Sequence, residues 1–411
     1  MVSNGDDGPK VTALSSSLGG VAGGSASAST RKRSHISRAS WMSHIKFPRV
    51  FSKRQSSTSL SPLPAPLPAP APAVLAAEVA IIGGNFTFLP SGSSFGSQRS
   101  QGLAIYGQDS ALRALPGSQI NGTVRSLYVE DNFLYVGGEF TIPEVQANGF
   151  AIYNLQARQW EMSGIQTLQA TAGSTVSVRS ISSSSARPNT IIVAGSFAQA
   201  GSLRCQAICL LDTSSRQWNP LGNGIQGEIS TVIYAGSNQE TLIAAGSIGL
   251  GDNTVANVAQ MSFSNLSWAA VGPASELPGP VTAVEINNGN TSSIFAAGKS
   301  SDGISFLSHY NGVNWTTLGS SLQANTVVSQ LAMVPLQDTH PGNTLIEADR
   351  MLMISGSLDD SSFGNASSAL FDGESFIPYV VSTTSTGTAG FVASMFHSFK
   401  SFSFNQRQTS F

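Results

Sequence analysis

The sequence predicts an all-β fold: a β-propeller of about six four-stranded blades that follows a disordered N-terminal segment. The main observation is a phrase that occurs six times, in which a short apolar run ends in glycine. Successive copies lie roughly 50 residues apart, a period that is typical of propellers and other repeat arrays. The composition agrees, because 41 glycines and only 11% charged residues suit sheets better than helices or a nucleic-acid-binding surface.

Each copy of the phrase ends a strand at a fixed glycine, as in the run Leu134–Phe140, which reads LYVGGEF. A Cβ is costly where backbones crowd, so we expect this glycine strand to lie nearest the propeller axis. The glycines are predicted to be structural. The six anchor positions are Gly84, Gly138, Gly195, Gly246, Gly298 and Gly356.

A second apolar run follows each glycine, and in the last five repeats an aromatic residue lies five or seven positions further on, whereas the first repeat has Ile105-Tyr106 but no Trp. This pattern predicts a hairpin, whose turn in one copy is the polar run Asn311–Asn314. One blade cannot bury its own face, so we expect Trp160, Trp218, Trp268 and Trp315 to pack between neighbouring blades as structural residues. The predicted pairs are Tyr153 with Trp160, Leu211 with Trp218, Met261 with Trp268, Tyr310 with Trp315, and Phe371 with Phe376.

A β-branched strand completes each repeat and gives four strands without any helical period. In the third repeat its position is less clear and is assigned to Val176–Val178. The first blade would begin with its glycine strand, so ring closure would match a leading strand with a trailing one. The other predicted strands are Val124–Val129, Ile229–Ile233, Val281–Ile286, Val327–Val334 and Phe391–Phe396.

The chain is divided by composition into four parts. Residues 1–59 are basic and rich in Ser and Gly, and they lack the apolar content that would offset the entropy of ordering. Residues 60–74 form a stiff Pro/Ala-rich linker, residues 75–396 form the propeller, and residues 397–411 form a tail.

The near-neutral total charge conceals a basic tail on an acidic domain. Residues 1–54 hold nine Lys or Arg and two Asp, which leaves 12 basic and 21 acidic residues for the remainder. The densest basic run, Arg31-Lys32-Arg33, is shorter than lipid-binding clusters usually are. A solvated tail is therefore favoured over a membrane or nucleic-acid contact, and no nucleic-acid partner is expected.

Six Asn-x-Ser/Thr sequons favour a secreted or lumenal domain, and they are glycosylation candidates. No signal peptide and no apolar stretch of membrane-spanning length accompanies them. We therefore expect that the chain is a fragment or comes from an imperfect gene sequence, rather than that it is a cytosolic domain whose sequons are not glycosylated. The candidates are Asn85, Asn121, Asn265, Asn290, Asn314 and Asn365.

The two cysteines, Cys205 and Cys209, leave two alternatives open. On one extended strand they would lie about 13 Å apart, too far for a disulfide, so a bridge requires a turn between them. A small disulfide loop and a pair of free thiols are equally compatible with the sequence. A metal site built on only two cysteines is not expected.

The sequence predicts no enzyme, and no catalytic, metal-binding or cofactor-binding residue. The repeats hold three histidines, His309, His340 and His397, without metal-ligand spacing, and neither a nucleophile elbow nor a phosphate loop. Basic residues are too few for the arginine cluster of a sialidase. The pair Asp359-Asp360 is more typical of a solvated loop than of a cation site.

The order of these phrases resembles one family. The stretch from Cys205 to Gly227 and the closing run SFKSFSFNQRQ are its most specific parts, whereas the glycine and Trp phrases are shared with other kelch-like propellers. From about Glu78 to Arg407, the chain looks like the C-terminal part of the fungal Rax-type bud-site-selection or cellular morphogenesis proteins. That resemblance implies a kelch-like propeller.

The resemblance also implies a cell-polarity landmark. Members of this family mark growth or division sites at the cell cortex, with an extracytoplasmic repeat region and a membrane span near the C-terminus. They act with a smaller membrane protein that is linked to small-GTPase machinery. The long N-terminal repeat region of the family is missing here, and the chain stops at Phe411, where the span would begin.

We therefore expect a non-enzymatic interaction module whose blade loops bind protein or cell-wall partners. Two alternatives remain: a secreted glycan-binding or glycan-active propeller, and a cytosolic kelch-like adaptor. Converging carboxylates or a Tyr–His pair on the axis would favour an enzyme, whereas an axis of Gly, Ala and Ser would favour the binding module. The loops Asp338–Gly342 and Asp359-Asp360 are candidate contacts.

Overall fold

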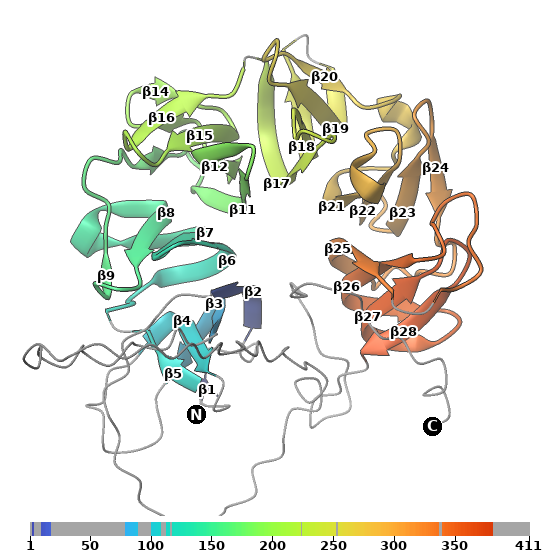
Figure 1. Cartoon of the computed structure of the whole chain (residues 1–411), viewed down its shortest axis with the longest axis horizontal. Helices are drawn as coiled ribbons and strands as arrows, with labels where there is room; N and C mark the ends of the chain where they lie inside the picture. The colour runs from blue at the N-terminus through green and yellow to red at the C-terminus, as the bar shows by residue number, and fades with distance from the viewer. Residues whose placement is uncertain are drawn as a thin grey trace, which may run out of the picture.

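The computed structural model arranges six sheets around a central axis (Figure 1), which confirms the predicted propeller. The structure describes residues 2–3, 10–17, 79–88, 100–107, 112–115, 117–222, 224–251, 254–336 and 339–380. Blades 2 to 6 lie within the predicted propeller segment, residues 75–396, whereas β1 and β2 of blade 1 lie outside it. The predicted linker at 60–74, the tail at 397–411 and the strand Phe391–Phe396 lie outside the described residues.

The first three blades are built as follows. Blade 1 holds β2 (Lys10–Ser17), β3 (Val79–Phe88), β4 (Ser100–Gly107) and β5 (Leu112–Ala114), with β1 (Val2–Ser3) also on β3. Blade 2 holds β6 (Asn121–Glu130), β7 (Phe133–Ile142), β8 (Ala147–Asn154) and β9 (Gln159–Trp160). Blade 3 holds β11 (Ser177–Ser184), β12 (Arg187–Ser196), β15 (Ile208–Asp212) and β16 (Gln217–Pro220).

The last three blades repeat the same order. Blade 4 holds β17 (Ile225–Ala235), β18 (Thr241–Leu250), β19 (Val255–Ser262) and β20 (Trp268–Ala270). Blade 5 holds β21 (Val281–Ile286), β22 (Ile294–Lys299), β23 (Ser305–Tyr310) and β24 (Trp315–Leu318). Blade 6 holds β25 (Val327–Pro335), β26 (Arg350–Asp360), β27 (Gly364–Phe371) and β28 (Phe376–Val380).

A small additional sheet and three short 3-10 turns lie outside the blades. The sheet joins β10 (Leu168–Gln169), β13 (Gln199–Ala200) and β14 (Leu203–Arg204) next to blade 3. The turns are η2 (Pro143–Val145), η3 (Ala274–Glu276) and η4 (Asn287–Gly289). Among the described residues, no helix is long and apolar enough to cross a membrane.

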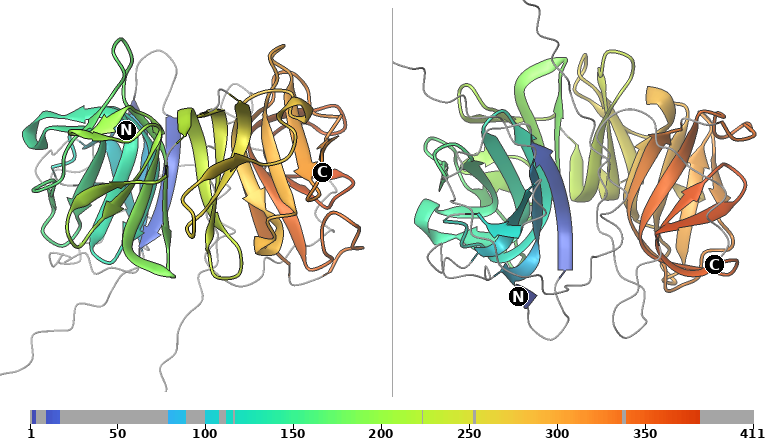
Figure 2. Two further views of the ribbon diagram at one scale, coloured as in Figure 1. Left: turned by 90° about the horizontal axis from the view of Figure 1, so that it is seen from above. Right: turned by 60° about the horizontal axis from the view of Figure 1, so that its bottom comes forward.

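The glycine strand is the second strand of each blade, so its predicted place nearest the axis is wrong. The innermost position belongs to the β-branched strand, as β6, β11, β17, β21 and β25 show (Figure 1). In blade 1 the innermost strand is β2 (Figure 2), which comes from the segment predicted to be disordered. Of residues 1–59, which were predicted to be disordered, the structure describes only the strands β1 and β2.

The anchor glycines are needed because the innermost strand bulges opposite them. In blade 2 the register shifts between Val124 and Ser126, directly opposite Gly138. A Cβ on Gly138 would lie 2.1 Å from the backbone oxygen of Thr123. Corresponding bulges face Gly84, Gly195, Gly246, Gly298 and Gly356. Crowding does select glycine here, but its source is a bulge in the neighbouring strand.

The predicted aromatic pairs are confirmed as directly opposed cross-strand partners. In blade 2, Tyr153 of the third strand lies opposite Trp160 of the outer strand, and their rings meet edge to face at 5.1 Å. Such pairs stabilise a hairpin beyond simple burial. The other four pairs are Leu211–Trp218, Met261–Trp268, Tyr310–Trp315 and Phe371–Phe376.

Each of these four tryptophans also joins its blade to the connection that enters it from the preceding blade. The indole Nε1 of Trp218 donates to the carbonyl of Gln166, and that of Trp315 donates to the carbonyl of Val271, both at 2.8 Å. Trp160 does the same to Gly117 at 3.0 Å. The expected packing between blades is therefore confirmed, and it includes a hydrogen bond that satisfies a carbonyl.

Candidate functional site

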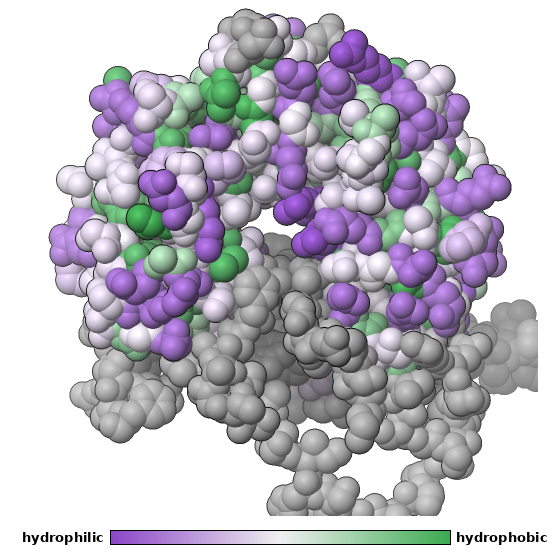
Figure 3. Space-filling view, turned by 180° about the vertical axis from the view of Figure 1, so that it is seen from behind, coloured by the Kyte–Doolittle hydropathy of each residue, from purple (hydrophilic) through white to green (hydrophobic). Residues whose placement is uncertain are grey.

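The ring has two distinct faces because neighbouring inner strands run in the same direction. The N–H of Val232 in blade 4 donates to Ser180 Oγ of blade 3, and Ser182 Oγ donates to the Val232 carbonyl. We call the side where inner strands begin the crossover face, because the chain passes from blade to blade there. The opposite side, with the turns after the inner and third strands, is the hairpin face. Figure 3 shows polar residues along much of the central opening.

Charged residues of blades 2 to 4 form a network where the inner strands begin. Arg125, the bulged residue of blade 2, lies 2.9 Å from Glu139, which follows the anchor glycine. Arg179, the bulged residue of blade 3, pairs with Glu228 of blade 4 at 2.6 Å. Blades 5 and 6 have Thr282 and Ser329 at the bulged position. The bulged positions of the inner strands are thus charged in blades 2 and 3 and uncharged in blades 5 and 6.

Glu139 is held in its ionised form. Burial opposes ionisation, but hydrogen bonds from Arg125 and Ser177 outweigh it and lower the pKa of the carboxyl group. Ser177 belongs to blade 3, so this carboxylate also joins two blades. Glu139 and Glu228 are each neutralised by an arginine and do not resemble a catalytic pair of carboxylates.

Glu285 on β21, like Glu130 at the end of β6, is an inner-strand carboxyl group whose pKa is raised by burial. Burial raises the pKa of Glu285 to about 7, although a backbone hydrogen bond from Ile286 acts in the opposite direction. The innermost strands carry Tyr128, Ser182, Ile233 and Ala332 at the corresponding position. The equivalent positions of blades 2 to 6 place no second carboxylate beside Glu285, so the described residues at this level of the axis lack the converging carboxylates expected of an enzyme. The axis is also not lined by Gly, Ala and Ser alone, which was the pattern expected of a binding module.

A cleft of about 410 Å³ opens on the crossover face between blades 3 and 4. The end of β12 contributes Ser196 and Phe197, and the start of β17 contributes Gln226 and Gly227. Gln206 and Thr171 come from the connections above blade 3, and Ala198 and Gly249 complete the lining. All of these side chains are uncharged, so the cleft offers amide and hydroxyl groups that can donate or accept hydrogen bonds without an electrostatic preference.

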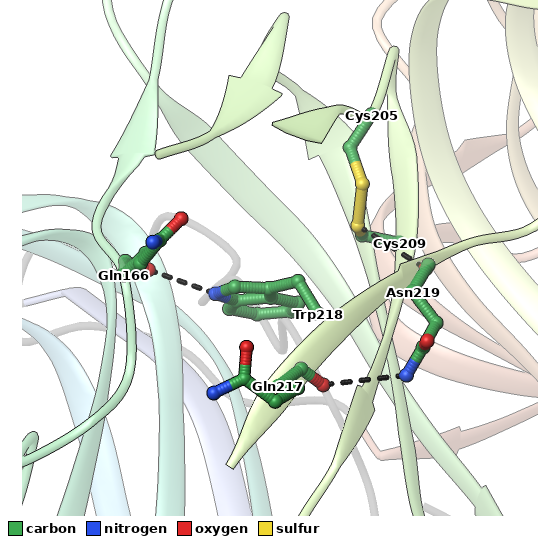
Figure 4. The surroundings of a disulfide bond; sticks show 6 residues. All are labelled: Gln166, Cys205, Cys209, Gln217, Trp218 and Asn219. Atoms are coloured by element: carbon green, nitrogen blue, oxygen red, sulfur yellow. Dashed lines mark hydrogen bonds between the residues drawn. A yellow bond between two sulfur atoms is a disulfide. The ribbon is translucent and has the colours of Figure 1, made fainter. Parts of the chain in front are cut away.

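The two cysteines form a disulfide beside this cleft (Figure 4). A tight turn brings their Cα atoms to 5.5 Å, with Ala207 in the left-handed region at φ 61°. Of the two alternatives open from the sequence, the structure has the small disulfide loop. Gln206 lies inside that loop, so the disulfide restrains one of the amides that line the cleft.

Exposed apolar residues lie on both faces. Val255 begins the third strand of blade 4 and is 62% exposed. Ile304 immediately precedes the third strand of blade 5 and is 54% exposed. Val327 begins the inner strand of blade 6, so these three residues are on the crossover face of consecutive blades. The hairpin face has Leu266 and Val313 in turns of blades 4 and 5.

All six predicted sequon asparagines are exposed. Asn265, Asn290 and Asn314 lie in turns of the hairpin face of blades 4 and 5. Two of them adjoin the exposed residues Leu266 and Val313 in sequence, so glycans there would cover these apolar side chains. Asn85, Asn121 and Asn365 lie toward the crossover face of blades 1, 2 and 6. The crossover face of blades 3 to 5 carries no sequon among its described residues.

The other residues singled out from the sequence have structural roles. Asp360 is buried and accepts hydrogen bonds from Ser321 Oγ and the backbone N–H of Ser362. His340 is buried with Nε2 2.7 Å from the carbonyl oxygen of Arg350, whereas Asp338 lies outside the described residues. His309 packs against Phe295 and contacts Ser293. The described residues contain no cluster of His, Cys, Asp and Glu that could hold a metal ion.

Sequence reasoning missed Gln206 and Gln226 because their proximity depends on how two blades pack. The bulged arginines could have been found by aligning the inner strands, since each follows the valine opposite an anchor glycine.

Comparison with known proteins identifies the family. Residues 150–407 match the family described as the Rax2 C-terminal beta propeller domain. The chain belongs to this family. It is 32% identical over 292 residues to Polarized growth protein L1 of Phoma sp., a match that covers 69% of this chain. It is 26% identical over 293 residues to Polarized growth protein RAX2 of Candida albicans, covering 66% of this chain.

This member of the Rax2 propeller family spans about a fifth of the length of those two relatives, 21% and 20%. A solved structure of a mitotic checkpoint complex also matches 80% of the chain and 90% of its own, at 15% identity and a TM-score of 0.42. That likeness is too distant to inform function. Both relatives are named as polarized growth proteins.

Proposed function

We propose that this propeller is a non-enzymatic module of a cell-polarity landmark, which binds a protein partner through the crossover face of blades 3 to 5. The observation that carries the proposal is the exposure of Val255 and Ile304 on that face in a member of a polarized-growth family. The corresponding apolar residues of the hairpin face adjoin sequons, whereas these do not. Loops on a rigid scaffold are common recognition elements.

The rest of the cellular role follows from the family. The module would act extracytoplasmically at the cell cortex of growth or division sites, attached to the plasma membrane through a span outside this chain. A smaller membrane polarity protein linked to small-GTPase machinery is the partner that we propose. Exposure of all six sequon asparagines supports passage through the secretory pathway. The pairing of Glu139 and Glu228 with arginines supports a binding role rather than catalysis.

A chimera tests this function. The matching region of the Candida albicans relative is replaced by this chain, and growth-site selection and cortical position are imaged. We expect the chimera to mark growth sites, and the double variant Val255→Asp/Ile304→Asp to lose this activity while its thermal midpoint stays unchanged. Val313→Asp, on the hairpin face, is the matched control and should behave as the parent. Loss of marking in the control alone would overturn the assignment of the face.

The sequons provide a separate test of compartment. Treatment of the secreted or membrane-extracted protein with an N-glycosidase should lower its apparent mass, and peptide mapping should place glycans on Asn265, Asn290 and Asn314. Unmodified asparagines in protein from the native fungus would instead support the cytosolic adaptor.

A second candidate function rests on the uncharged cleft. Amides and hydroxyls such as Gln206, Gln226 and Ser196 are groups that recognise neutral saccharides. Under this alternative the module binds cell-wall glycan. Titration with chitin hexasaccharide and laminarihexaose would show saturable binding that is lost in Gln226→Ala. Gln323→Ala, at an exposed glutamine of blade 6, is the control.

A further inference from the structure

Blade 3 differs from blades 2 and 4 to 6 in the connection between its second and third strands. In those blades the two strands stay paired up to the turn that joins them, as at Gly249 and Val255 of blade 4. In blade 3 the pairing of β12 with β15 ends at Ala194 and Ile208. Residues 197–207 instead leave the blade and form β13 and β14 of the small sheet. We call these residues the wall segment.

The wall segment lines one side of the cleft between blades 3 and 4. It contributes Phe197, Ala198 and Gln206, whereas Gln226 comes from blade 4. Arg204 donates from Nη2 to Oε1 of Gln206 at 3.2 Å, which leaves the amide N–H groups of Gln206 available to a ligand. Any movement of the wall segment therefore changes both the shape of the cleft and the position of this amide.

The elements that hold the wall segment are short. β13 and β14 have two residues each, and β13 pairs with the equally short β10. Within the segment, the N–H of Cys205 donates to the carbonyl oxygen of Ala198 at 3.1 Å. The N–H of Ala207 donates in the same way to Phe197 at 2.9 Å. Sheets of so few residues have little stability of their own, so a covalent tie has a large effect on the position of the segment.

The disulfide ties the wall segment to the centre of the blade (Figure 4). Cys209 lies on β15 between Val193 of β12 and Pro220 of β16, and its side chain is completely buried. Cys205 belongs to the wall segment. Two free thiols need more room than a disulfide, because unbonded sulfur atoms keep a van der Waals separation. Because Cys209 is fixed on both sides, we expect Cys205 to move in the reduced protein and to carry Gln206 with it.

We propose that the Cys205–Cys209 disulfide is a latch that completes the cleft, which binds an uncharged saccharide only in the oxidised protein. This inference rests on the second candidate function, in which the cleft binds cell-wall glycan. When the bond forms, the two thiols lose two protons and two electrons to a partner disulfide, which is reduced to two thiols. Such oxidation occurs in the secretory pathway, so the cleft becomes competent in the compartment where sequons are glycosylated.

Burial makes this latch close once rather than act as a reversible sensor. Cys205 is 2% exposed and Cys209 is 0% exposed. A thiolate must reach one of the sulfur atoms to reduce the bond, so reduction of the native protein requires the wall segment to open first. Dithiothreitol should therefore reduce the native protein more slowly than the urea-unfolded protein, as thiol titration measures. Equal rates contradict a latch that closes once.

Hydrogen exchange read by mass spectrometry tests the latch without a ligand. In Cys205→Ser/Cys209→Ser we expect amide exchange in residues 197–207 to become at least about tenfold faster than in the oxidised wild-type protein. Exchange in β18 and β19 of blade 4 should stay unchanged. Wild-type protein that has been reduced should match the variant, and it replaces the variant if the variant does not fold. Unchanged exchange in residues 197–207 overturns the proposal.

Titration with laminarihexaose tests the consequence for binding. Cys205→Ser/Cys209→Ser should bind at least about tenfold more weakly than the oxidised wild-type protein, because the cleft is no longer preorganised. Ser202→Ala, at an exposed residue of the wall segment that does not line the cleft, is the matched control and should bind like the parent. Equal affinity of the oxidised protein and the cysteine variant overturns the proposal. If the oxidised protein itself does not bind, the saccharide function fails, and hydrogen exchange still decides whether the disulfide positions the wall segment.

Discussion

The indole Nε1 of Trp268 donates a 2.8 Å hydrogen bond to the carbonyl oxygen of Leu221, so blade 4 is joined to the connection that leaves blade 3. Both residues are buried. Leu221 and Gly222 form the apolar-glycine step after Trp218, and Gly222 has a φ of 70°. The same step, Val271-Gly272, receives Trp315. The repeated phrase therefore has two roles. Its Trp donates a hydrogen bond to the preceding connection, and the carbonyl of its apolar residue accepts one from the Trp of the next blade.

Trp268→Phe should lower the free energy of unfolding by about 1–3 kcal/mol, because most of the ring area remains while the buried Leu221 carbonyl loses its donor. Urea denaturation measures the change. Trp160→Phe is the control: Trp160 is only half-buried, so water can replace its bond to Gly117 and the loss should be smaller. Equal losses in the two variants would argue against the role of the buried bond.

Gly246→Ala should destabilise the protein by about 3 kcal/mol or more, because the new Cβ would lie 2.1 Å from the carbonyl oxygen of Glu228. Gly249→Ala, on the same strand, is the matched control. Its Cβ would meet the side chain of Gln226 at an ordinary 3.4 Å, so we expect little change or a slight gain in stability. Thermal unfolding compares the two variants. If both have the same stability, the bulge does not explain why position 246 is glycine.

Glu285 makes stability depend on pH in a defined direction. Its pKa rises from 4.5 to about 7 on folding, so the folded state retains a proton that the unfolded state releases. The stability that this proton provides is complete below pH 4.5 and is lost as the pH rises through 7. Glu285→Gln should remove this dependence and raise the free energy of unfolding at pH 8 by on the order of 2 kcal/mol. An unchanged pH profile would contradict the burial of this carboxyl group.

Glu139 has the opposite dependence. Its folded pKa lies below the unfolded value of 4.5, so its stabilising contribution is present above that value and is lost as the pH falls through the folded pKa. Arg125→Gln removes the closest cation and should move the pKa of Glu139 upward, which can be followed by NMR titration. Arg204→Gln, at an exposed arginine, should leave it unchanged.

The disulfide closes a short loop between Cys205 and Cys209, for which chain entropy gives about 2 kcal/mol of stabilisation. Cys205→Ser/Cys209→Ser should therefore unfold at lower urea concentration while the far-ultraviolet circular dichroism stays that of a sheet protein. Wild-type protein with added reductant should match the variant. A difference between these two samples would indicate an effect of the substitutions beyond the lost bond.

The number of blades and the hairpin between the third and fourth strands of blades 2 to 6 followed from the sequence alone, whereas the β-branched strand, which was predicted to complete each repeat, begins the next blade in the structure. Tyr153 with Trp160 and Leu211 with Trp218 are separated by one short turn, so hairpin chemistry and alternation determine their contact locally. The structural role of the tryptophans was also predictable, because a blade with two apolar faces must pack against neighbours.

Tertiary structure decided the radial order of the strands and the surface that they create. Gly138 and Val124 each fit an innermost strand by composition, and only the arrangement of the sheets around the axis shows that the valine strand is inside (Figure 1). The pairing of Arg179 with Glu228, and the meeting of Gln206 with Gln226, join different blades. Such contacts depend on the angle at which whole sheets pack, and no local pattern of side chains encodes that angle.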